Sequence, residues 1–330
     1  MSPRIATRLT KRFNLDHPII SAPMARAAGG KLAAAVTDAG GLGLIGGGYG
    51  DAVWLEEQFR ASGNAAIGCG FITWSIQGKP GLLDRALEHR PKALMLSFGD
   101  PAPFAAAIAE AGVPLICQCQ TLDHVHQGIA AGASVIVAQG GEAGGHGSGR
   151  GTMGFVPEVV DLVRRESPST LVVAAGGIAE GRGLAAALAL GADGVLMGTR
   201  FWASSEAHVH PNHHATILQS NGDATIRTSI PDKARSYPWP SCFSIRVLNN
   251  RYVQRWAGRE SELVANISVE GPKYSNAFEQ GDVDNAAVIF GEAAGLITTV
   301  EPVAVLIDRI VHEAVLALNG ANDLVGADAA

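Results

Sequence analysis

The sequence predicts an α/β protein: a (β/α)8 TIM barrel with a second, smaller and mainly helical domain inserted after strand eight. Three observations support this fold class. Eight short apolar runs alternate with Ala-rich segments of helical pattern, the rhythm of repeated β/α units. Residues 172–201 form one βαβ unit with glycine at the end of each strand. After Ala207 the alternation stops, and Pro, Trp, Arg and Asn become frequent.

The predicted strands are largely apolar, as expected of parallel strands buried on both faces. They lie at residues 19–22, 42–45, 66–71, 93–97, 115–118, 135–139, 171–175 and 194–197. Helical patterns lie between them, at residues 30–39, 103–111, 122–131 and 155–165. Eight such strands are the number that closes a barrel.

The domain boundaries follow the change in pattern. Residues 1–210 are expected to form the barrel, with residues 285–318 packing back on it, and residues 319–330 to be a flexible tail. Residues 211–284 are expected to form the smaller domain and to cover the ligand-bearing rim, because they follow strand eight. Tyr237, Trp239 and Phe243 either wall a small apolar substrate pocket or form this domain's own core.

Composition argues against several functions. The net charge is −6 and no Lys/Arg run occurs, so neither nucleic acid nor a membrane surface is an expected partner. No stretch approaches the ~18 apolar residues that span a bilayer, and the first residues lack an apolar leader, so a cytoplasmic protein is expected. The four cysteines form no disulfide framework, and Cys117 and Cys119 are expected to be buried on one strand face. No metal site is expected from His208, His210, His213 and His214, whose spacing matches no closed zinc pattern.

The βαβ unit predicts a phosphate site. Its first strand ends at Gly176 and Gly177, and its second ends at Gly198 and Thr199. Glycine lets a backbone approach a ligand closely, so two neighbouring strand ends offer free N–H groups and one hydroxyl. In (β/α)8 barrels the phosphate site lies after strands seven and eight, which is where this unit falls.

The clearest chemical signal is the loop after strand six, which reads QGGEAGGHG from Gln139 to Gly147. Its one imidazole, His146, lies among residues with almost no side chains. Catalytic groups gather at the ends of barrel strands, so His146 is predicted to be a general base near neutral pH. Glu142 is expected to be solvated or to hold backbone N–H groups.

Five motifs occur in the order PIISAPMA, AGGLGLIGGG, QGGEAGGHG, AAGGIAEGRG and LMGTRFWASSEA, and they resemble the nitronate monooxygenases, formerly called 2-nitropropane dioxygenases. The motifs span residues 18–207, and the segment with PWP and RVLNNRYVQRWAGRE is similar to the family's second domain. This resemblance implies an FMN-dependent enzyme that oxidises alkyl nitronates or small nitroalkanes with O₂ to carbonyl compounds and nitrite. It also places His146 at the catalytic histidine.

The resemblance implies which residues hold FMN. Ala22, Pro23 and Met24 would lie against the isoalloxazine, and Gln139, Gly144 and Gly145 would also contact the flavin. Those around the ribityl phosphate are Gly176, Gly177, Leu196, Met197, Gly198 and Thr199. Related sequences often carry Asn at the end of strand three, where this chain has Gly68-Cys69-Gly70. Two outcomes are open: Thr73 or Gln118 replaces that amide contact, or the flavin is held more loosely.

Two alternatives stay open at this point. The first is an NAD(P)H-dependent flavin reductase of a quinone or an enoyl thioester on the same barrel, because such enzymes share much of the pattern. The absence of a GxGxxG dinucleotide motif on a second Rossmann unit slightly disfavours it. The second is a flavin-binding protein without turnover. The expected partners are a nitroalkane or nitronate and O₂. The oligomeric state stays open, and a homodimer is one option.

Overall fold

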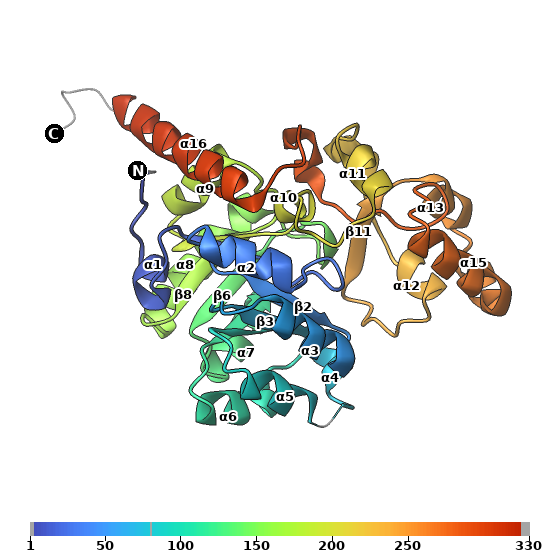
Figure 1. Cartoon of the computed structure of the whole chain (residues 1–330), viewed down its shortest axis with the longest axis horizontal. Coiled ribbons are helices and arrows are strands. Elements are labelled where there is room, and N and C mark those ends of the chain that lie inside the picture. The colour runs from blue at the N-terminus through green and yellow to red at the C-terminus, as the bar shows by residue number, and fades with distance from the viewer. Residues whose placement is uncertain (1–2, 80, 325–330) are drawn as a thin grey trace.

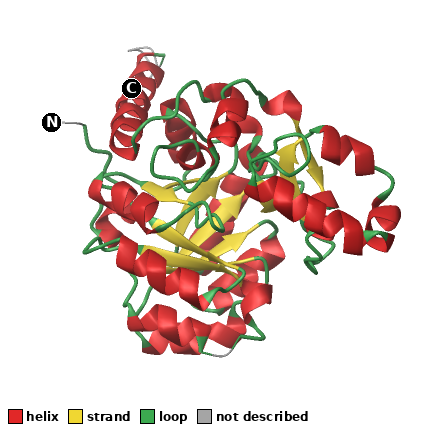
Figure 2. Cartoon of the chain, turned by 45° about the vertical axis from the view of Figure 1, so that its right-hand side comes forward, coloured by secondary structure: helices red, strands yellow, loops and turns green. Residues whose placement is uncertain are grey.

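Eight parallel strands form a barrel surrounded by helices in the computed structural model, which describes residues 3–79 and 81–324 (Figures 1 and 2). The strands are β1 (Ile19–Ser21), β2 (Leu44–Gly48), β3 (Gly68–Ile72), β4 (Leu94–Ser97), β5 (Leu115–Cys119), β6 (Val135–Gln139), β8 (Leu171–Ala175) and β9 (Gly194–Met197). Their order is β1-β9-β8-β6-β5-β4-β3-β2. The ring closes where the Ser21 N–H donates to the Leu42 carbonyl at 3.0 Å. The predicted TIM barrel is confirmed.

The barrel interior is filled by apolar side chains and closed at the N-terminal ends of the strands by α1 (Arg8–Phe13). Leu9 and Phe13 of α1 belong to the same buried cluster as Ile20, Met95 and Val173. Arg8 binds Asp193, just before β9, through Nε at 2.8 Å and Nη2 at 2.7 Å. This helix was not expected from the sequence pattern.

The outer helices bury a second apolar layer against the strands. They are α2 (Gly30–Asp38), α3 (Ala52–Ala61), α4 (Thr73–Ile76), α5 (Leu82–Glu88), α6 (Ala102–Glu110), α7 (Leu122–Ala130), α8 (Thr152–Glu166), α9 (Gly181–Ala189) and α16 (Val303–Asp323), with the short α10 (Thr199–Trp202) after β9. α16 packs against α9 and α2, so the chain returns to the barrel. No helix in the described ranges is long and apolar enough to cross a membrane.

The flexible tail expected at residues 319–330 needs a correction. Residues 319–323 continue α16, because a helix already anchored through Val311 and Ala314 extends at little cost for each further residue. Residues 325–330 lie outside the described residues.

The smaller domain lies to one side of the barrel (Figure 1). Its elements are α11 (Pro211–Ile217), η1 (Gly222–Ala224), β10 (Thr225–Thr228), α12 (Ile230–Ala234), β11 (Ser244–Leu248), α13 (Arg251–Trp256), α14 (Glu260–Ala265) and α15 (Ile267–Glu279), followed by η2 (Glu292–Leu296). A buried cluster that includes Ile230, Val247, Tyr252 and Tyr274 forms its core.

A three-stranded antiparallel sheet joins this domain to the barrel. Its order is β10-β11-β7, and β7 (Gly145–Gly147) belongs to the glycine-rich loop after β6. In this register Ile245 pairs with His146. The smaller domain is therefore mainly helical, as expected, but its few strands hold the loop that carries the candidate base.

Candidate active site

His146 is held by a carboxylate from the smaller domain. Its Nε2 lies 3.0 Å from both carboxylate oxygens of Asp232, a residue of α12 that is 86 positions later in the chain. The two side chains are 9% and 4% exposed. Arg235 donates from Nη2 to Oδ1 of Asp232 at 2.9 Å, so the carboxylate lies between a guanidinium and the imidazole.

Burial lowers the pKa of His146 below its usual 6.5. Asp232 acts in the opposite direction, because its hydrogen bond and its charge favour the imidazolium, while Arg235 and Arg227 reinforce the lowering. The imidazole is therefore neutral at neutral pH. A neutral imidazole has one nitrogen able to accept a proton, as a general base requires.

Aromatic side chains from both domains surround His146. The indole of Trp239 stacks on the imidazole with ring centroids 3.4 Å apart and planes 7° apart. Its Nε1 donates to the Tyr49 hydroxyl at 3.0 Å. Phe98 makes edge contacts with His146 at 6.1 Å, with Trp239 at 5.1 Å and with Phe243 at 5.2 Å.

The contacts of Tyr237, Trp239 and Phe243 argue against one of their two interpretations, that they form the core of the smaller domain. Tyr237 packs on Tyr49 of the barrel, with ring centroids 4.3 Å apart, while Trp239 and Phe243 gather around Phe98. The core of the smaller domain is built from other residues. The three aromatic residues therefore pack between the smaller domain and the barrel, with Trp239 directly against His146. Phe98 has a φ of +65°, an unusual value for a bulky residue that commonly marks functional sites.

Two arginines hold the glycine loop in place. Arg227 of β10 donates from Nε to the Gly141 carbonyl at 3.0 Å and from Nη2 to the Ala143 carbonyl at 3.3 Å. Arg246 of β11 donates from Nε to the same Gly141 carbonyl at 3.1 Å. Burial lowers the pKa of Arg227 to about 10, so it stays charged at neutral pH. A loop of small residues thus gains its order from the neighbouring sheet.

Glu142 caps α8, which confirms one of its two expected roles. Its carboxylate accepts from the Thr152 backbone N–H at 2.9 Å and from the Thr152 hydroxyl at 2.8 Å. Gly144 is a glycine because of chain packing, since a Cβ there would lie 2.6 Å from the Gly291 nitrogen. Gly145 has a φ of +71°, which favours glycine.

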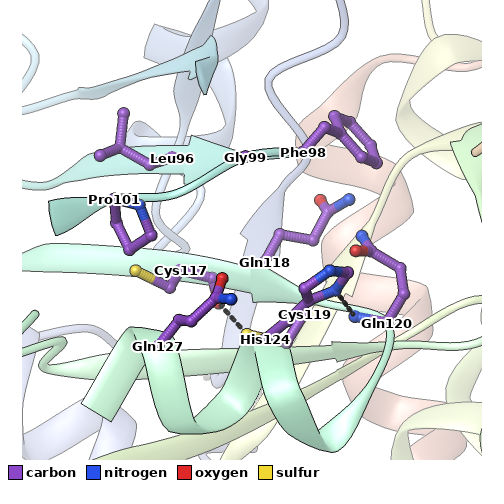
Figure 3. A pocket seen from close by; sticks show the side chains of 10 residues that line it. All are labelled: Leu96, Phe98, Gly99, Pro101, Cys117, Gln118, Cys119, Gln120, His124 and Gln127. Atoms are coloured by element: carbon purple, nitrogen blue, oxygen red, sulfur yellow. Dashed lines mark hydrogen bonds between the residues drawn. The ribbon is translucent and has the colours of Figure 1, made fainter. Parts of the chain in front are cut away.

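A cluster of glutamine amides lies behind the His146 loop. Gln139 accepts at Oε1 from Gln118 at 3.0 Å and from Gln120 at 2.9 Å, and its Nε2 donates to the His146 carbonyl at 3.1 Å. Figure 3 shows Gln118 and Gln120 extending from the end of β5 toward Phe98. They line a cavity of about 10 Å³, the room that one water molecule needs.

The two residues expected to replace the missing asparagine differ in exposure. Thr73 is fully buried beneath Gly99, whereas Gln118 is half-buried. Gln118 is therefore the more accessible of the two side chains. The structure also explains the absence of asparagine at Gly70, because a Cβ there would lie 2.5 Å from Cγ of Pro23.

The residues predicted to bind phosphate share one rim with those predicted to meet the flavin ring. Gly176 and Gly177 both have left-handed φ values, +102° and +72°, and Gly177 is exposed. The Ala22 N–H donates to the Met197 carbonyl at 2.9 Å, so the end of β1 is joined to the end of β9. Leu196 and Met197 are buried and can offer a ligand only main-chain atoms.

Gly198 and Thr199 complete this rim. A Cβ at Gly198 would meet Ala22 and Met24 at 3.5 and 3.7 Å, so the protein leaves space there. The Thr199 hydroxyl accepts from the Gly291 N–H at 3.0 Å and keeps its own proton for donation. Main-chain atoms of glycine and one hydroxyl at this rim suit the phosphate of a ligand, and room for at least a methyl group lies beside Ala22.

A sequence model of the family described as nitronate monooxygenase matches residues 6–66 and 72–313. The chain belongs to the nitronate monooxygenase family. Nitronate monooxygenase npaC from Metarhizium robertsii is 36% identical over 328 residues, which covers 88% of each chain. A nitronate monooxygenase from Neurospora crassa is 33% identical and covers 90% of this chain and 88% of its own.

Solved structures agree with this family assignment. FabK from Thermotoga maritima superposes with a TM-score of 0.84 at 29% identity, covering 97% of this chain and 100% of its own. Nitroalkane oxidase from Streptomyces ansochromogenes gives 0.78 at 26% identity, covering 95% and 99%. As a nitronate monooxygenase family member, the protein is an oxidoreductase that uses a flavin.

The described residues contain no group of three or more His, Cys, Asp or Glu that could hold a metal ion. Cys69, Cys117 and Cys119 are buried free thiols, as predicted for the pair on β5, and Cys242 is exposed.

The site residues that the sequence did not reveal are Asp232, Arg235, Phe98 and Gln120. They come from distant segments and match no motif.

Proposed function

We propose that this protein is an FMN-dependent nitronate monooxygenase that oxidises alkyl nitronates or small nitroalkanes with O₂ to carbonyl compounds and nitrite. The observation that carries the proposal is the neutral, carboxylate-held His146 within an aromatic enclosure at the end of a barrel strand. The family assignment supports the same chemistry.

FMN is the flavin proposed because its single phosphate suits the glycine-rich strand ends at Gly177 and Gly198. Gly177, Gly198 and Thr199 would hold the ribityl phosphate through main-chain N–H groups and a hydroxyl. Ala22, Pro23 and Met24 would lie against the ring, with Gln118 and Gln139 at its polar edge. When bound, FMN accepts electrons from the substrate and passes them to O₂.

His146 then has one task in the reaction of a neutral nitroalkane, which is to take the proton from the carbon next to the nitro group. That C–H bond breaks, an N–H bond forms on the imidazole, and the electron pair stays on the substrate as the nitronate. The aromatic wall around His146 excludes water and offers an apolar surface to a short alkyl chain. A nitronate that arrives already deprotonated does not need the base.

Anaerobic mixing tests the proposal. The purified holoprotein is mixed with an alkyl nitronate and, separately, with NADH and NADPH, while flavin absorbance is followed. Reduction by nitronate alone, reversed by O₂, is expected; reduction by nicotinamide alone would contradict the proposal. His146→Asn is expected to lower turnover of the neutral nitroalkane about 100-fold or more while flavin binding stays normal. Unchanged turnover would remove the base assignment.

The second candidate is the NAD(P)H-dependent flavin reductase acting on a quinone or an enoyl thioester. The likeness to FabK, with a TM-score of 0.84, is the observation that favours it. The nicotinamide arm of the same experiment distinguishes the two candidates. Prompt reduction by NADH or NADPH, with reoxidation by a quinone or an enoyl thioester, would establish the reductase.

A further inference from the structure

We propose that Asp232 is a positioning residue that holds His146 as the Nε2–H tautomer, so that Nδ1 is the atom that accepts the substrate proton. The inference deepens the proposed function and rests on it for the identity of the substrate. The tautomer of His146 depends only on the contacts within this chain and not on the identity of the substrate.

The hydrogen-bonding chemistry of the pair sets the tautomer. An ionised carboxylate only accepts hydrogen bonds, and both oxygens of Asp232 lie 3.0 Å from Nε2 of His146. Nε2 must therefore carry the proton that it donates. In a neutral imidazole the other nitrogen is then the acceptor. Within the described ranges, Nδ1 has no hydrogen-bond partner in the protein.

The imidazole ring of His146 has little freedom to turn. One face of the imidazole is covered by Trp239, and its Nε2 edge faces Asp232. Asp232 also anchors the segment that carries Trp239, because its carbonyl accepts from the Tyr237 N–H at 2.9 Å. Residue 146 is itself held in a strand register opposite Ile245. One helix of the smaller domain thus fixes both an edge and a face of the base.

The charges around the pair suit this role. Asp232 faces His146 from α12, and two cations, Arg235 and Arg227, lie near the pair. The arginines disfavour an imidazolium in the resting state, whereas Asp232 stabilises the imidazolium that forms when Nδ1 takes a proton. The carboxylate therefore orients the neutral ring first and balances its charge afterwards, while Arg235 holds the carboxylate in place at 2.9 Å.

Nitrogen-15 NMR of the histidine-labelled holoprotein tests the tautomer directly. The His146 signals are assigned by their loss in His146→Asn. We expect the Nε2–H form in the wild-type protein and a shift toward Nδ1–H in Asp232→Asn, because an asparagine amide can donate to Nε2. An Nδ1–H tautomer in the wild-type protein would overturn the proposal. This measurement needs no substrate, so it stands even if the proposed function fails.

Kinetics with two substrates of equal chain length provide the second readout. For Asp232→Asn, turnover of the neutral nitroalkane is expected to fall about 100-fold or more, whereas turnover of the corresponding nitronate stays within about threefold, because only the neutral form needs the base. An equal loss for both substrates, or no loss for the nitroalkane, would contradict the inference. Asp232→Glu, which keeps an accepting carboxylate, is expected to recover part of the nitroalkane activity.

Asp193→Asn is the matched control. Asp193 is also buried and paired with an arginine, Arg8, but it lies at the opposite end of the barrel. Its substitution removes a comparable ion pair without touching His146. We expect the ratio of nitroalkane to nitronate turnover in this variant to equal that of the wild-type protein. A changed ratio in both variants would show a general structural effect and would overturn the assignment to Asp232.

Discussion

Gly198→Ala is expected to weaken flavin binding while leaving the flavin-free fold intact. Gly198 has a φ of −102°, which alanine adopts without strain. The added methyl group would meet Cβ of Ala22 at 3.5 Å and Sδ of Met24 at 3.7 Å, which are ordinary van der Waals contacts. The protein alone therefore has room for the methyl group. A phosphate lying against the Gly198 backbone, as proposed, would compete with the methyl group for the same space.

The size of the effect follows from the contact that would be lost. One hydrogen bond from a backbone N–H to a charged phosphate contributes about 1.5–3 kcal/mol, which corresponds to an increase in the FMN Kd of roughly 10- to 150-fold. The free energy of unfolding of the apoprotein is expected to stay equal or to rise by up to about 1 kcal/mol, because alanine restricts the unfolded chain.

Titration of the apoprotein with FMN, followed by the quenching of flavin fluorescence, gives the Kd, and urea denaturation gives the stability. The matched control is Gly154→Ala in α8, where a Cβ would meet nothing within 4 Å. A Kd for Gly198→Ala within twofold of the control would refute the phosphate site at Gly198. A destabilised apoprotein would show that the space beside Ala22 and Met24 is not available.

Two further predictions concern stability. Burial lowers the pKa of His213 from 6.5 to about 4. Between these pH values the unfolded chain binds more protons at this residue than the folded protein does. The free energy of unfolding should therefore fall by at most about 3 kcal/mol as the pH drops from 6.5 to 4. His213→Gln should flatten this dependence in urea denaturation at pH 7 and pH 4.5, and equal slopes in both proteins would exclude His213 as its source. Leu9→Ala in α1, the helix that closes the barrel, should lower the free energy of unfolding by about 2–5 kcal/mol. Val53→Ala on α3, where the Val53 side chain is 69% exposed, should change it by less than about 0.5 kcal/mol. Similar values for the last two variants would show that α1 does not seal the barrel.

The local sequence pattern was sufficient to predict the barrel and one candidate catalytic residue, His146. The eight strands are short, largely apolar runs, and such runs form strands where both faces of the sheet can be buried, here by the outer helices and by the barrel interior. His146 was identifiable because it is the one ionisable ring in a glycine loop at a strand end. The α1 plug was missed because Leu9 and Phe13 show their role only when the barrel exists for them to fill.

The sequence by itself determined the barrel, the glycine rim at Gly177 and Gly198, and the position of His146 in the loop after β6. Only the tertiary structure decided what surrounds that histidine. Asp232 and Trp239 reach it because β11 pairs with the short strand β7, a segment of glycines with no strand pattern of its own. Contacts between residues far apart in sequence leave no local periodicity, so the set of residues that surrounds His146 emerges only when the two domains pack.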